Sequence, residues 1–375
     1  MKIHHVITRL ILGGAQENTV LTCEGLHRRG HEVTLVTGPA LGPEGELFER
    51  ARRGGYRIAL VEAMRREIEP WNDWRAYRAL RRLFREERPE VVHTHSSKAG
   101  ILGRRAAWVE KVPLVVHTIH GLPFDDYRSP LAGRFFRACE RAAGRWCHRL
   151  FCVGEVMKDR AVAAGLGPPE MFEVVWSGME VERFLAAPDR NAARRGLGIP
   201  PESFVVGAVG RLAPFKGQAY LVDAAREAHL LFVGDGTLRA DLEGRARAKG
   251  VRATFAGMVP PERMPELLAA MDVLAHTSFR EGLPRAIPQA ILAGVPVVAF
   301  DCDGAREVVE PGVTGELVEP GDIPGLRAAL GRVRGLRIRE DVRRRFAERF
   351  RWERMVDRLE GAYAECLNGT PHPVI

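Results

Sequence analysis

Along the whole chain, short runs of β-branched and aliphatic residues alternate with longer segments whose apolar residues recur at three- and four-residue intervals. Strands that alternate with helices of about 10–15 residues predict a parallel, doubly wound sheet. The alternation ends near residue 177 and starts again at residue 204, so the sequence predicts two α/β domains with a cleft between them. We place these domains at residues 1–177 and 178–350. A final helix within residues 351–375 is expected to pack back on the first domain.

The expected strands are short. In the first domain they cover residues 3–8, 31–38, 56–61, 91–95, 115–121, 151–154 and 172–176, and in the second domain residues 204–212, 230–234, 253–257, 273–276 and 295–300. Among the expected helices, segment 71–88 has one apolar stripe, made of Trp74, Tyr77, Leu80, Leu83 and Phe84, and arginines on its other side. A solvated face and a membrane-surface helix are both compatible with this pattern.

The composition limits the classes of partner and the cellular compartment. The 375 residues carry a formal charge of +8, and 50 of the 56 basic residues are arginine. A pocket for an anionic substrate, or a face turned to anionic lipid, accounts for this charge as well as nucleic acid does. The six cysteines are scattered without a C-x-x-C pair, which favours a reducing compartment over disulfides or a zinc site. We expect no signal peptide, and no apolar run approaches the roughly 20 residues needed to cross a bilayer. We therefore predict a cytoplasmic protein that is at most peripheral to the inner membrane.

One strand–turn–helix segment, residues 278–294, carries a carboxylate where ligands bind in open α/β sheets. Glu281 lies on the turn E-G-L-P, after the expected strand 273–276 and before a segment with helical spacing. The N–H groups at the start of that helix suit a phosphate, which leaves the carboxylate for a neutral part of the ligand. A simple capping role for Glu281 explains the same pattern about equally well.

Two cations follow another expected strand. Arg211 and Lys216 lie five residues apart on the turn V-G-R-L-A-P-F-K-G, whose glycine spacing is not that of a P-loop. A planar guanidinium and a compact ammonium group suit a diphosphate, so we favour phosphate binding over a solvated turn. The pairs Gly13-Gly14 and Gly234-Asp-Gly236 also follow strands, where they permit either close approach of a ligand or a tight turn.

Four histidines gather on two neighbouring expected strands and the turn after them: His93, His95, His117 and His120. No carboxylate or cysteine at ligand spacing accompanies them, so a metal cluster is the weakest interpretation. Buried, hydrogen-bonded histidines are the strongest one. His120 is the best candidate for a functional histidine, because it stands last before Gly121 and therefore at the rim of the sheet.

In this order, the motifs resemble those of the GT-B fold retaining glycosyltransferases of family 4, which include many bacterial polysaccharide and lipid-sugar transferases. The resemblance covers almost the whole length through G-G-A-Q (13–16), H-T-H-S-S-K-A-G-I-L-G-R (93–104), V-H-T-I-H-G (116–121), V-G-R-L-A-P-F-K-G (209–217), V-G-D-G (233–236) and E-G-L-P-R-A (281–286). It implies two Rossmann-like domains facing across a cleft. The first would bind a sugar or lipid-linked acceptor and the second a nucleotide-sugar such as a UDP- or GDP-sugar, with no metal, no other cofactor and no nucleic acid.

The resemblance also implies roles for single residues. Arg211 and Lys216 would hold the diphosphate and neutralise the charge on the leaving group, and the backbone N–H groups of Gly14 and Leu283 would add donors. Glu281 would accept hydrogen bonds from hydroxyls of the donor sugar. His120, from the first domain, would lie beside that sugar. The anomeric configuration would be retained, with the departing phosphate oxygen taking the proton of the acceptor.

One position departs from the family pattern. A second Glu usually stands eight residues after the first, and this chain has Gln289 there. Glutamine offers one acceptor oxygen to the ribose where a carboxylate offers two, so weaker nucleotide binding is expected. The other site residues favour an active glycosyltransferase in surface polysaccharide or glycolipid synthesis.

Two other functions are compatible with parts of the pattern. A nucleotide-sugar epimerase would use the same architecture but would need acid–base carboxylates beyond Glu281. A binding protein without enzymatic activity would explain the charge, although no alternation of aromatic and basic residues supports nucleic-acid binding.

Overall fold

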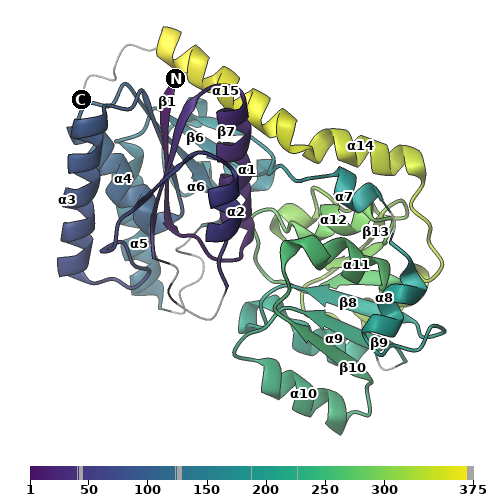
Figure 1. The fold of residues 1–375 in the computed structure, drawn as a ribbon. Coiled ribbons are helices and arrows are strands. Elements are labelled where there is room, and N and C mark those ends of the chain that lie inside the picture. Colours follow the sequence, from purple (N-terminus) through teal and green to yellow (C-terminus); the bar gives the residue numbers. More distant parts are fainter. Residues whose placement is uncertain are drawn as a thin grey trace. The chain divides into compact units, whose positions relative to one another are not determined.

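The structure, a computed structural model, describes residues 1–39, 41, 45–122, 124, 129–186, 188–225 and 227–369. The chain divides into two compact units, which we call unit 1 (Met1–Met179 with Trp352–Ile375) and unit 2 (Glu180–Arg351). In each unit, helices are layered on a sheet (Figure 1). The predicted pair of doubly wound α/β domains is therefore confirmed.

Unit 1 is built on a seven-stranded parallel sheet with the order β3-β2-β1-β4-β5-β6-β7. Its strands are β1 (Lys2–Arg9), β2 (Glu32–Gly38), β3 (Arg57–Leu60), β4 (Val91–His95), β5 (Leu114–Ile119), β6 (Arg149–Cys152) and β7 (Phe172–Val174). Its helices are α1 (Gly14–Arg28), α2 (Phe48–Arg53), α3 (Pro70–Glu87), α4 (Ser97–Val109), α5 (Pro130–Gly144), α6 (Glu155–Ala163) and α15 (Trp352–Gly369).

Helices cover both faces of the unit 1 sheet. Ile3 and Ile7 of β1 belong to a core cluster with α1 and α15, whereas Val6 belongs to a cluster with α3 and α4. Successive side chains of a strand point to opposite faces, so both faces of β1 are buried. This burial explains why apolar residues occur at both odd and even positions of β1.

The C-terminal helix α15 packs back on unit 1, as expected. Met355, Leu359 and Tyr363 recur at four-residue intervals along it and are buried in the cluster that contains α1. Arg29, at the end of α1, donates a hydrogen bond of 2.6 Å to Glu360. Residues 370–375 of the expected C-terminal region lie outside the described residues.

Helix α3 departs from the expected stripe. Its buried residues are Ala76, Leu80 and Phe84, at a strict four-residue interval, and Trp74 is 45% exposed. Trp74 instead stacks on Trp71, with ring centroids 5.0 Å apart. Among the described helices, none combines the length and apolar character that crossing a bilayer would need.

Unit 2 is built on a six-stranded parallel sheet with the order β10-β9-β8-β11-β12-β13. Its strands are β8 (Val205–Val209), β9 (His229–Val233), β10 (Ala253–Gly257), β11 (Val273–His276), β12 (Val297–Phe300) and β13 (Gly315–Val318). Its helices are α7 (Glu182–Leu185), α8 (Arg190–Gly196), α9 (Gln218–Ala224), α10 (Arg239–Ala248), α11 (Met264–Ala269), α12 (Ala286–Leu292), α13 (Ile323–Arg332) and α14 (Glu340–Phe350).

Strand β13 was not among the expected strands. It is four residues long, lies at the edge of the sheet and begins with Gly315. A Cβ at Gly315 would lie 1.8 Å from the backbone oxygen of Val297, so the close approach of β12 requires glycine there. Glycine weakens the strand pattern in a sequence, which is why this edge was missed.

Candidate functional site

In unit 2 the candidate site lies where the order of the strands reverses. From β8 the chain continues to β9 on one side, and from β11 it continues to β12 on the other side. The loops after β8 and β11 therefore leave the carboxyl edge of the sheet in opposite directions. Ligands of open α/β sheets bind at such a switch point.

Backbone contacts join these two loops. The N–H of Phe279 donates to the backbone oxygen of Phe215 at 2.9 Å, and the Thr277 hydroxyl donates to that of Lys216 at 3.0 Å. Gly217 has a φ of +64°, and a Cβ there would lie 2.1 Å from the oxygen of Thr277. Only glycine allows this approach, which holds Lys216 beside the segment that carries Glu281.

The side chains of Lys216 and Glu281 form an ion pair, although 65 positions separate them in the sequence. The Nε2 atom of His276, the last residue of β11, lies 3.3 Å from the same carboxylate. Burial raises the pKa of Glu281, but the neighbouring His276 ring and the charge of Lys216 outweigh it and bring the pKa down to about 2. Glu281 is thus an ionised acceptor at neutral pH.

Asp303 fixes the backbone of Glu281. It follows β12, and its Oδ2 atom accepts a hydrogen bond of 2.8 Å from the N–H of Glu281. Its φ of +40° is unusual for a residue other than glycine. Next to it, a Cβ at Gly304 would lie 2.3 Å from the oxygen of Gly282, so the two loops are closely packed.

Sequence reasoning did not single out His276 or Asp303 as site residues. His276 is the last residue of β11, and Asp303 follows the carboxyl end of the neighbouring strand β12. That position was the available signal, because the carboxyl ends of parallel strands meet at one edge of the sheet.

Arg211 lies on the same loop as Lys216 and is exposed. Among the described residues, its guanidinium group makes no hydrogen bond or ion pair. The following turn packs against this loop, since Leu212 donates its N–H to the oxygen of Asp235 at 3.0 Å. A Cβ at Gly234 would lie 2.1 Å from the oxygen of Gly210, so close packing explains this glycine.

The remaining predicted residues of unit 2 lie beside α12. Leu283 is buried three residues before this helix begins, and Gln289 is half-buried in its middle. Pro288 stands in the first turn of α12, where its missing N–H costs no helical hydrogen bond. The Gln289 side chain has no hydrogen-bond partner within the described residues.

Gly14 and His120 belong to unit 1, whereas the other predicted site residues belong to unit 2. Gly14 is the first residue of α1, a helix of 15 residues that starts after β1. His120 directly follows β5, and its Nε2 atom lies 3.1 Å from Nδ1 of His95.

The other three histidines of the predicted group, His93, His95 and His117, are buried and hydrogen-bonded, as the strongest interpretation of this group expects. His93 bonds to the Tyr363 hydroxyl at 2.5 Å and to the Thr118 hydroxyl at 2.7 Å, and His117 bonds to Thr94 at 2.9 Å.

By distance alone, His5, His93 and His95 could hold a metal, since one nitrogen of each lies within 4.8 Å of the others. However, the rings of His93 and His95 are stacked 4.2 Å apart at 29°. Ring nitrogens bind a metal in the plane of the ring, so stacked rings point their lone pairs side by side instead of at one ion.

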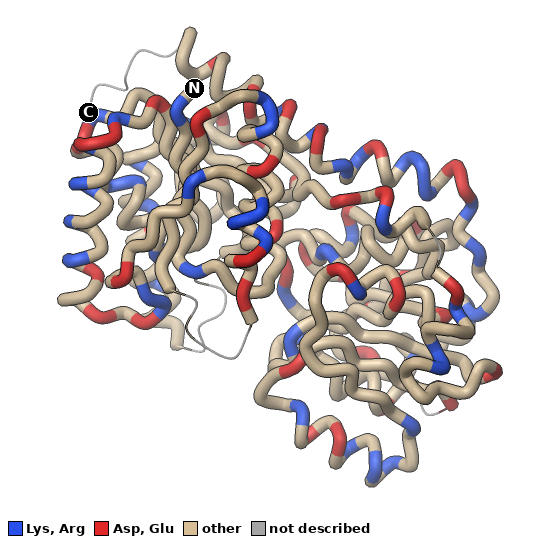
Figure 2. The backbone as a smooth tube through the Cα atoms, in the orientation of Figure 1, with Lys and Arg blue, Asp and Glu red and all other residues tan. Residues whose placement is uncertain are grey.

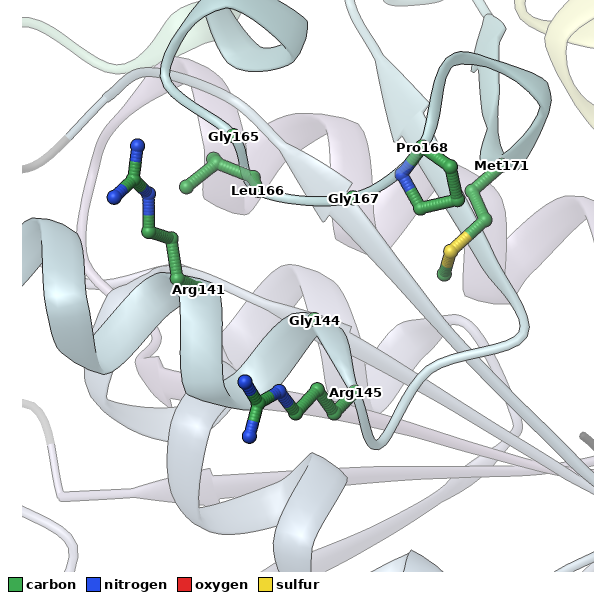
Figure 3. A pocket seen from close by; sticks show the side chains of 8 residues that line it. All are labelled: Arg141, Gly144, Arg145, Gly165, Leu166, Gly167, Pro168 and Met171. Carbon is green, nitrogen blue, oxygen red and sulfur yellow. The ribbon is translucent and has the colours of Figure 1, made fainter. Parts of the chain in front are cut away.

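Unit 1 also has a surface cavity of about 400 Å³ (Figure 3). It is lined by Arg141 and Arg145 near the end of α5 and by the segment that joins α6 to β7, including Leu166 and Met171. Both elements end at the amino edge of the sheet. The cavity is therefore distant from the carboxyl edge, where ligands of this architecture bind.

Two families match successive parts of the chain. Residues 13–178 match the family model described as "Glycosyl transferase 4-like domain", and residues 203–334 match "Glycosyl transferases group 1". A GDP-mannose-dependent alpha-mannosyltransferase of Mycobacterium tuberculosis is 30% identical over 83% of this chain and 81% of its own length. The chain belongs to the GT-B glycosyltransferases of family 4 type.

Other relatives extend the match over nearly the full length of this glycosyltransferase. The Escherichia coli "UDP-Gal:alpha-D-GlcNAc-diphosphoundecaprenol alpha-1,3-galactosyltransferase" is 28% identical over 98% of this chain and 97% of its own. The solved structure of Anabaena HepE in complex with UDP superposes with a TM-score of 0.80 at 22% identity, covering 97% of this chain and all of that one. Sucrose-phosphate synthase from Thermosynechococcus elongatus gives 0.81 at 20% identity, covering 99% and 100%. These structures support the GT-B fold. The matched families and relatives are transferases, so the epimerase alternative gains no support.

Proposed function

We propose that this glycosyltransferase moves a hexosyl group from a UDP-sugar to a hydroxyl of a lipid-linked sugar, with retention of the anomeric configuration. The Escherichia coli relative, named for UDP-galactose and a diphosphoundecaprenol-linked GlcNAc, supports this choice because the two chains align almost end to end. The reaction would serve surface polysaccharide or glycolipid synthesis at the cytoplasmic face of the membrane. Unit 1 would bind the acceptor and unit 2 the nucleotide-sugar.

The contact between Lys216 and Glu281 at the switch point of unit 2 carries the proposal. It puts a cation for a diphosphate next to an ionised acceptor for sugar hydroxyls, which are the two chemistries that a nucleotide-sugar needs. The exposed Arg211 on the same loop would add a planar donor for phosphate oxygens. No metal is required in this arrangement, because the two cations neutralise the diphosphate.

In the proposed reaction, the bond between the anomeric carbon and the phosphate oxygen breaks, and the acceptor oxygen bonds to that carbon on the same face. The acceptor proton passes to the departing phosphate oxygen, so the products are the glycoside and UDP. Arg211 and Lys216 stabilise the charge that develops on UDP. Glu281 orients the sugar as a hydrogen-bond acceptor, because its low pKa keeps it ionised.

Four further residues would complete the site. The backbone N–H groups of Gly14 and Leu283 would donate to the diphosphate or the sugar, as groups at helix starts can. Gln289 would hydrogen-bond one ribose hydroxyl through its amide. His120 would lie beside the donor sugar.

Activity with substituted proteins tests this assignment. Lys216→Ala and Glu281→Ala are each expected to lower kcat with UDP-galactose and a lipid-linked GlcNAc acceptor at least ~100-fold, as loss of a charge-stabilising contact often does. UDP release and glycolipid product would be measured together, with GDP-mannose as the competing donor. Lys249→Ala is the matched control, because Lys249 also pairs with a carboxylate of unit 2, Asp223 at 2.6 Å. Lys249 stands at the C-terminal end of α10, whereas α10 begins after the Gly234-Asp-Gly236 turn at the carboxyl edge of the sheet.

Near-normal turnover in both site variants would refute the site assignment. Turnover of GDP-mannose but not of UDP-sugars would support the glycosyltransferase activity and would contradict the proposed UDP-sugar donor. UDP-sugar epimerisation without transfer would contradict the proposal altogether.

A second observation supports contact with a lipid surface. At the carboxyl edge of the unit 1 sheet, the start of α3 exposes Trp71 (67%) and the start of α5 exposes Leu131 (74%) and Phe135 (60%). Exposed arginines accompany them, Arg134 on α5 among them, and basic residues recur along α3 (Figure 2). Aromatic and aliphatic side chains beside arginines suit an anionic bilayer, where the rings enter the headgroup region and the cations meet phosphates.

Vesicle sedimentation tests this contact. Trp71→Ser and Phe135→Ser together should lower binding to vesicles that contain phosphatidylglycerol and leave activity on a short, soluble acceptor unchanged. Val313→Ser in unit 2 is the control, since Val313 is also an exposed apolar residue, at 42%. Equal binding of the wild type to anionic and neutral vesicles would contradict the electrostatic part of the argument.

A further inference from the structure

The ring of His276 faces the carboxylate of Glu281 without forming a hydrogen bond to it. His276 is the last residue of β11 and is 7% exposed, and its Nε2 atom lies 3.3 Å from Oε1 of Glu281. Within the described residues, this buried nitrogen has no hydrogen-bond partner. Buried polar atoms without a partner are uncommon in folded proteins, so the place of this one beside a carboxylate needs a physical reason.

The carboxylate determines which ring nitrogen carries a proton. Glu281 is ionised, and the oxygens of an ionised carboxylate only accept hydrogen bonds. A bare Nε2 would turn its lone pair toward the lone pairs of Oε1 at 3.3 Å, which is repulsive. Nε2 of His276 therefore carries a proton, whatever the state of the other ring nitrogen.

Lys216 explains why this N–H is not used. Its ammonium group pairs with the same oxygen, Oε1, and so occupies the acceptor that the ring of His276 faces. The other oxygen of Glu281, Oε2, makes no hydrogen bond among the described residues. Both donors of the protein thus meet at one oxygen, which leaves Oε2 for the hydroxyls of a ligand.

The backbone around this contact is held in place, so the movement of one side chain is enough to exchange the two donors. The Thr277 hydroxyl, next to His276, donates to the backbone oxygen of Lys216 at 3.0 Å. The N–H of Glu281 donates to Asp303 at 2.8 Å. The ammonium group is carried by a flexible stem of four carbons, whereas the ring is short and buried. The ammonium group is therefore the donor that can move away, and the ring is the donor that remains.

We propose that His276 is a positioning residue for Glu281: when a diphosphate draws Lys216 away, the Nε2–H of His276 takes over Oε1 and keeps Oε2 turned toward the sugar. This exchange rests on the proposed function, because it needs a phosphate-bearing ligand beside Lys216. Without a second donor, the movement of Lys216 would leave an unpaired carboxylate in a nearly buried position. The hydroxyls of a UDP-sugar compensate that charge further, so binding of UDP alone isolates the part played by His276.

The affinity for UDP, measured by isothermal titration calorimetry, tests the exchange through a double-mutant cycle. His276→Leu removes the donor, and we expect it to weaken UDP binding about tenfold, the effect of one hydrogen bond to a charged group. In a Glu281→Gln background there is no charge to hold, so His276→Leu should change the affinity less than about threefold. His276→Gln is the conservative control, because its amide N–H can replace Nε2–H, and it should bind UDP within about threefold of the wild type.

Two results of this cycle would overturn the proposal. Equal losses of affinity in the wild-type and Glu281→Gln backgrounds would mean that His276 acts through packing and not through the carboxylate. UDP binding by His276→Leu that matches the wild type would mean that Glu281 needs no second donor.

Nuclear magnetic resonance of protein labelled with ¹⁵N-histidine tests the same exchange without a ligand. The His276 signals are those that vanish in His276→Gln. We expect a protonated Nε2 in the wild type, and a shift of its proton to lower field in Lys216→Met, because the vacated Oε1 then accepts the hydrogen bond. Lys249→Met is the matched control, since it removes a lysine that pairs with Asp223 at 2.6 Å, and it should leave the His276 signals unchanged.

A bare Nε2, or the same proton signal in the wild type and in Lys216→Met, would overturn the proposal. If the wild type bound no UDP, the proposed function would fail, and the comparison with Lys216→Met would still decide whether His276 takes over Oε1.

Discussion

Replacing Glu281 by glutamine tests whether an ionised carboxylate holds the loop after β11 in place. The carboxylate has its pKa at about 2 against an ordinary 4.5, because His276 and Lys216 outweigh the cost of burial. A difference of this size corresponds to about 3 kcal/mol of unfolding free energy at neutral pH. Glutamine keeps the shape but not the charge, so the wild type should be more stable than Glu281→Gln by up to about 3 kcal/mol at pH 6.

The pH dependence gives the sharper test. The pKa is lower in the folded protein, so the stabilisation is fully present above about pH 4.5 and is lost as the pH falls through about 2. At pH 3 about 1 kcal/mol of it should remain. The stability difference between wild type and Glu281→Gln should therefore shrink by roughly 2 kcal/mol between pH 6 and pH 3.

Urea unfolding at the two pH values measures this difference, and the chain offers an internal control. All six tryptophans lie in unit 1, so tryptophan fluorescence follows that unit, while far-ultraviolet circular dichroism follows both units. Only the unit 2 transition should change. Glu348→Gln is the matched control, since Glu348 is an exposed partner of Arg351 at 3.0 Å and should have no measurable effect. A difference that stays the same at pH 6 and pH 3 would refute the ionised state of Glu281.

Three further predictions concern unit 2. Gly217→Ala should lower the unfolding free energy by about 2 kcal/mol or more and lower kcat as well, because it combines a φ of +64° with a clash at the oxygen of Thr277. Arg194→Met should cost roughly 3 kcal/mol in urea unfolding, since it removes the buried guanidinium that donates to Asp272 at 2.7 Å and to the backbone oxygens of Ala270 and Ser203 at 3.0 Å, although Arg190 still pairs with Asp272. Asp303→Gly should change stability little, because relief of its φ of +40° offsets the lost hydrogen bond, yet lower kcat about tenfold in steady-state kinetics.

Each of these has a matched control. Gly244→Ala, in α10 with no atom within 4 Å of its Cβ position, should be neutral or slightly stabilising. Arg344→Met removes an exposed pair with Glu340 and should cost well under 1 kcal/mol. Asp303→Asn keeps an acceptor and should retain most of the activity. If a control behaved like its test variant, the effect would come from the substitution in general and not from the stated contact.

The fold could be predicted because the pattern of each strand follows directly from burial. Parallel strands covered on both faces are largely apolar, and β8 (V-V-G-A-V) and β12 (V-V-A-F) are such runs. The same rule fails at the edges. At β13 the close approach of Val297 excludes a Cβ at Gly315, and at the start of α3 the exposed Trp74 belongs to no core.

The site could be predicted only in part. The carboxyl-edge rule suffices to put Lys216 and Glu281 at one edge, because it depends on strand order alone. The additional contacts depend on backbone angles that the sequence does not reveal. Asp303 reaches the N–H of Glu281 from a φ of +40°, a conformation that aspartate rarely adopts. His276 looks like an ordinary end of a strand until the turn back to Glu281 is known.

The ion pair of Lys216 and Glu281 links the stability of unit 2 to the ligand that we propose. Without a ligand, the ammonium group is the charge partner of the buried carboxylate. A diphosphate would draw that ammonium toward itself, and sugar hydroxyls would have to replace its hydrogen bond to Glu281. UDP alone offers the phosphates without the hydroxyls, whereas a UDP-sugar offers both. Binding of the UDP-sugar should therefore leave Glu281 better compensated than binding of UDP, so the UDP-sugar should bind more tightly. Glu281→Gln removes the charge that must be compensated, and it should therefore reduce the difference in affinity between UDP-sugar and UDP.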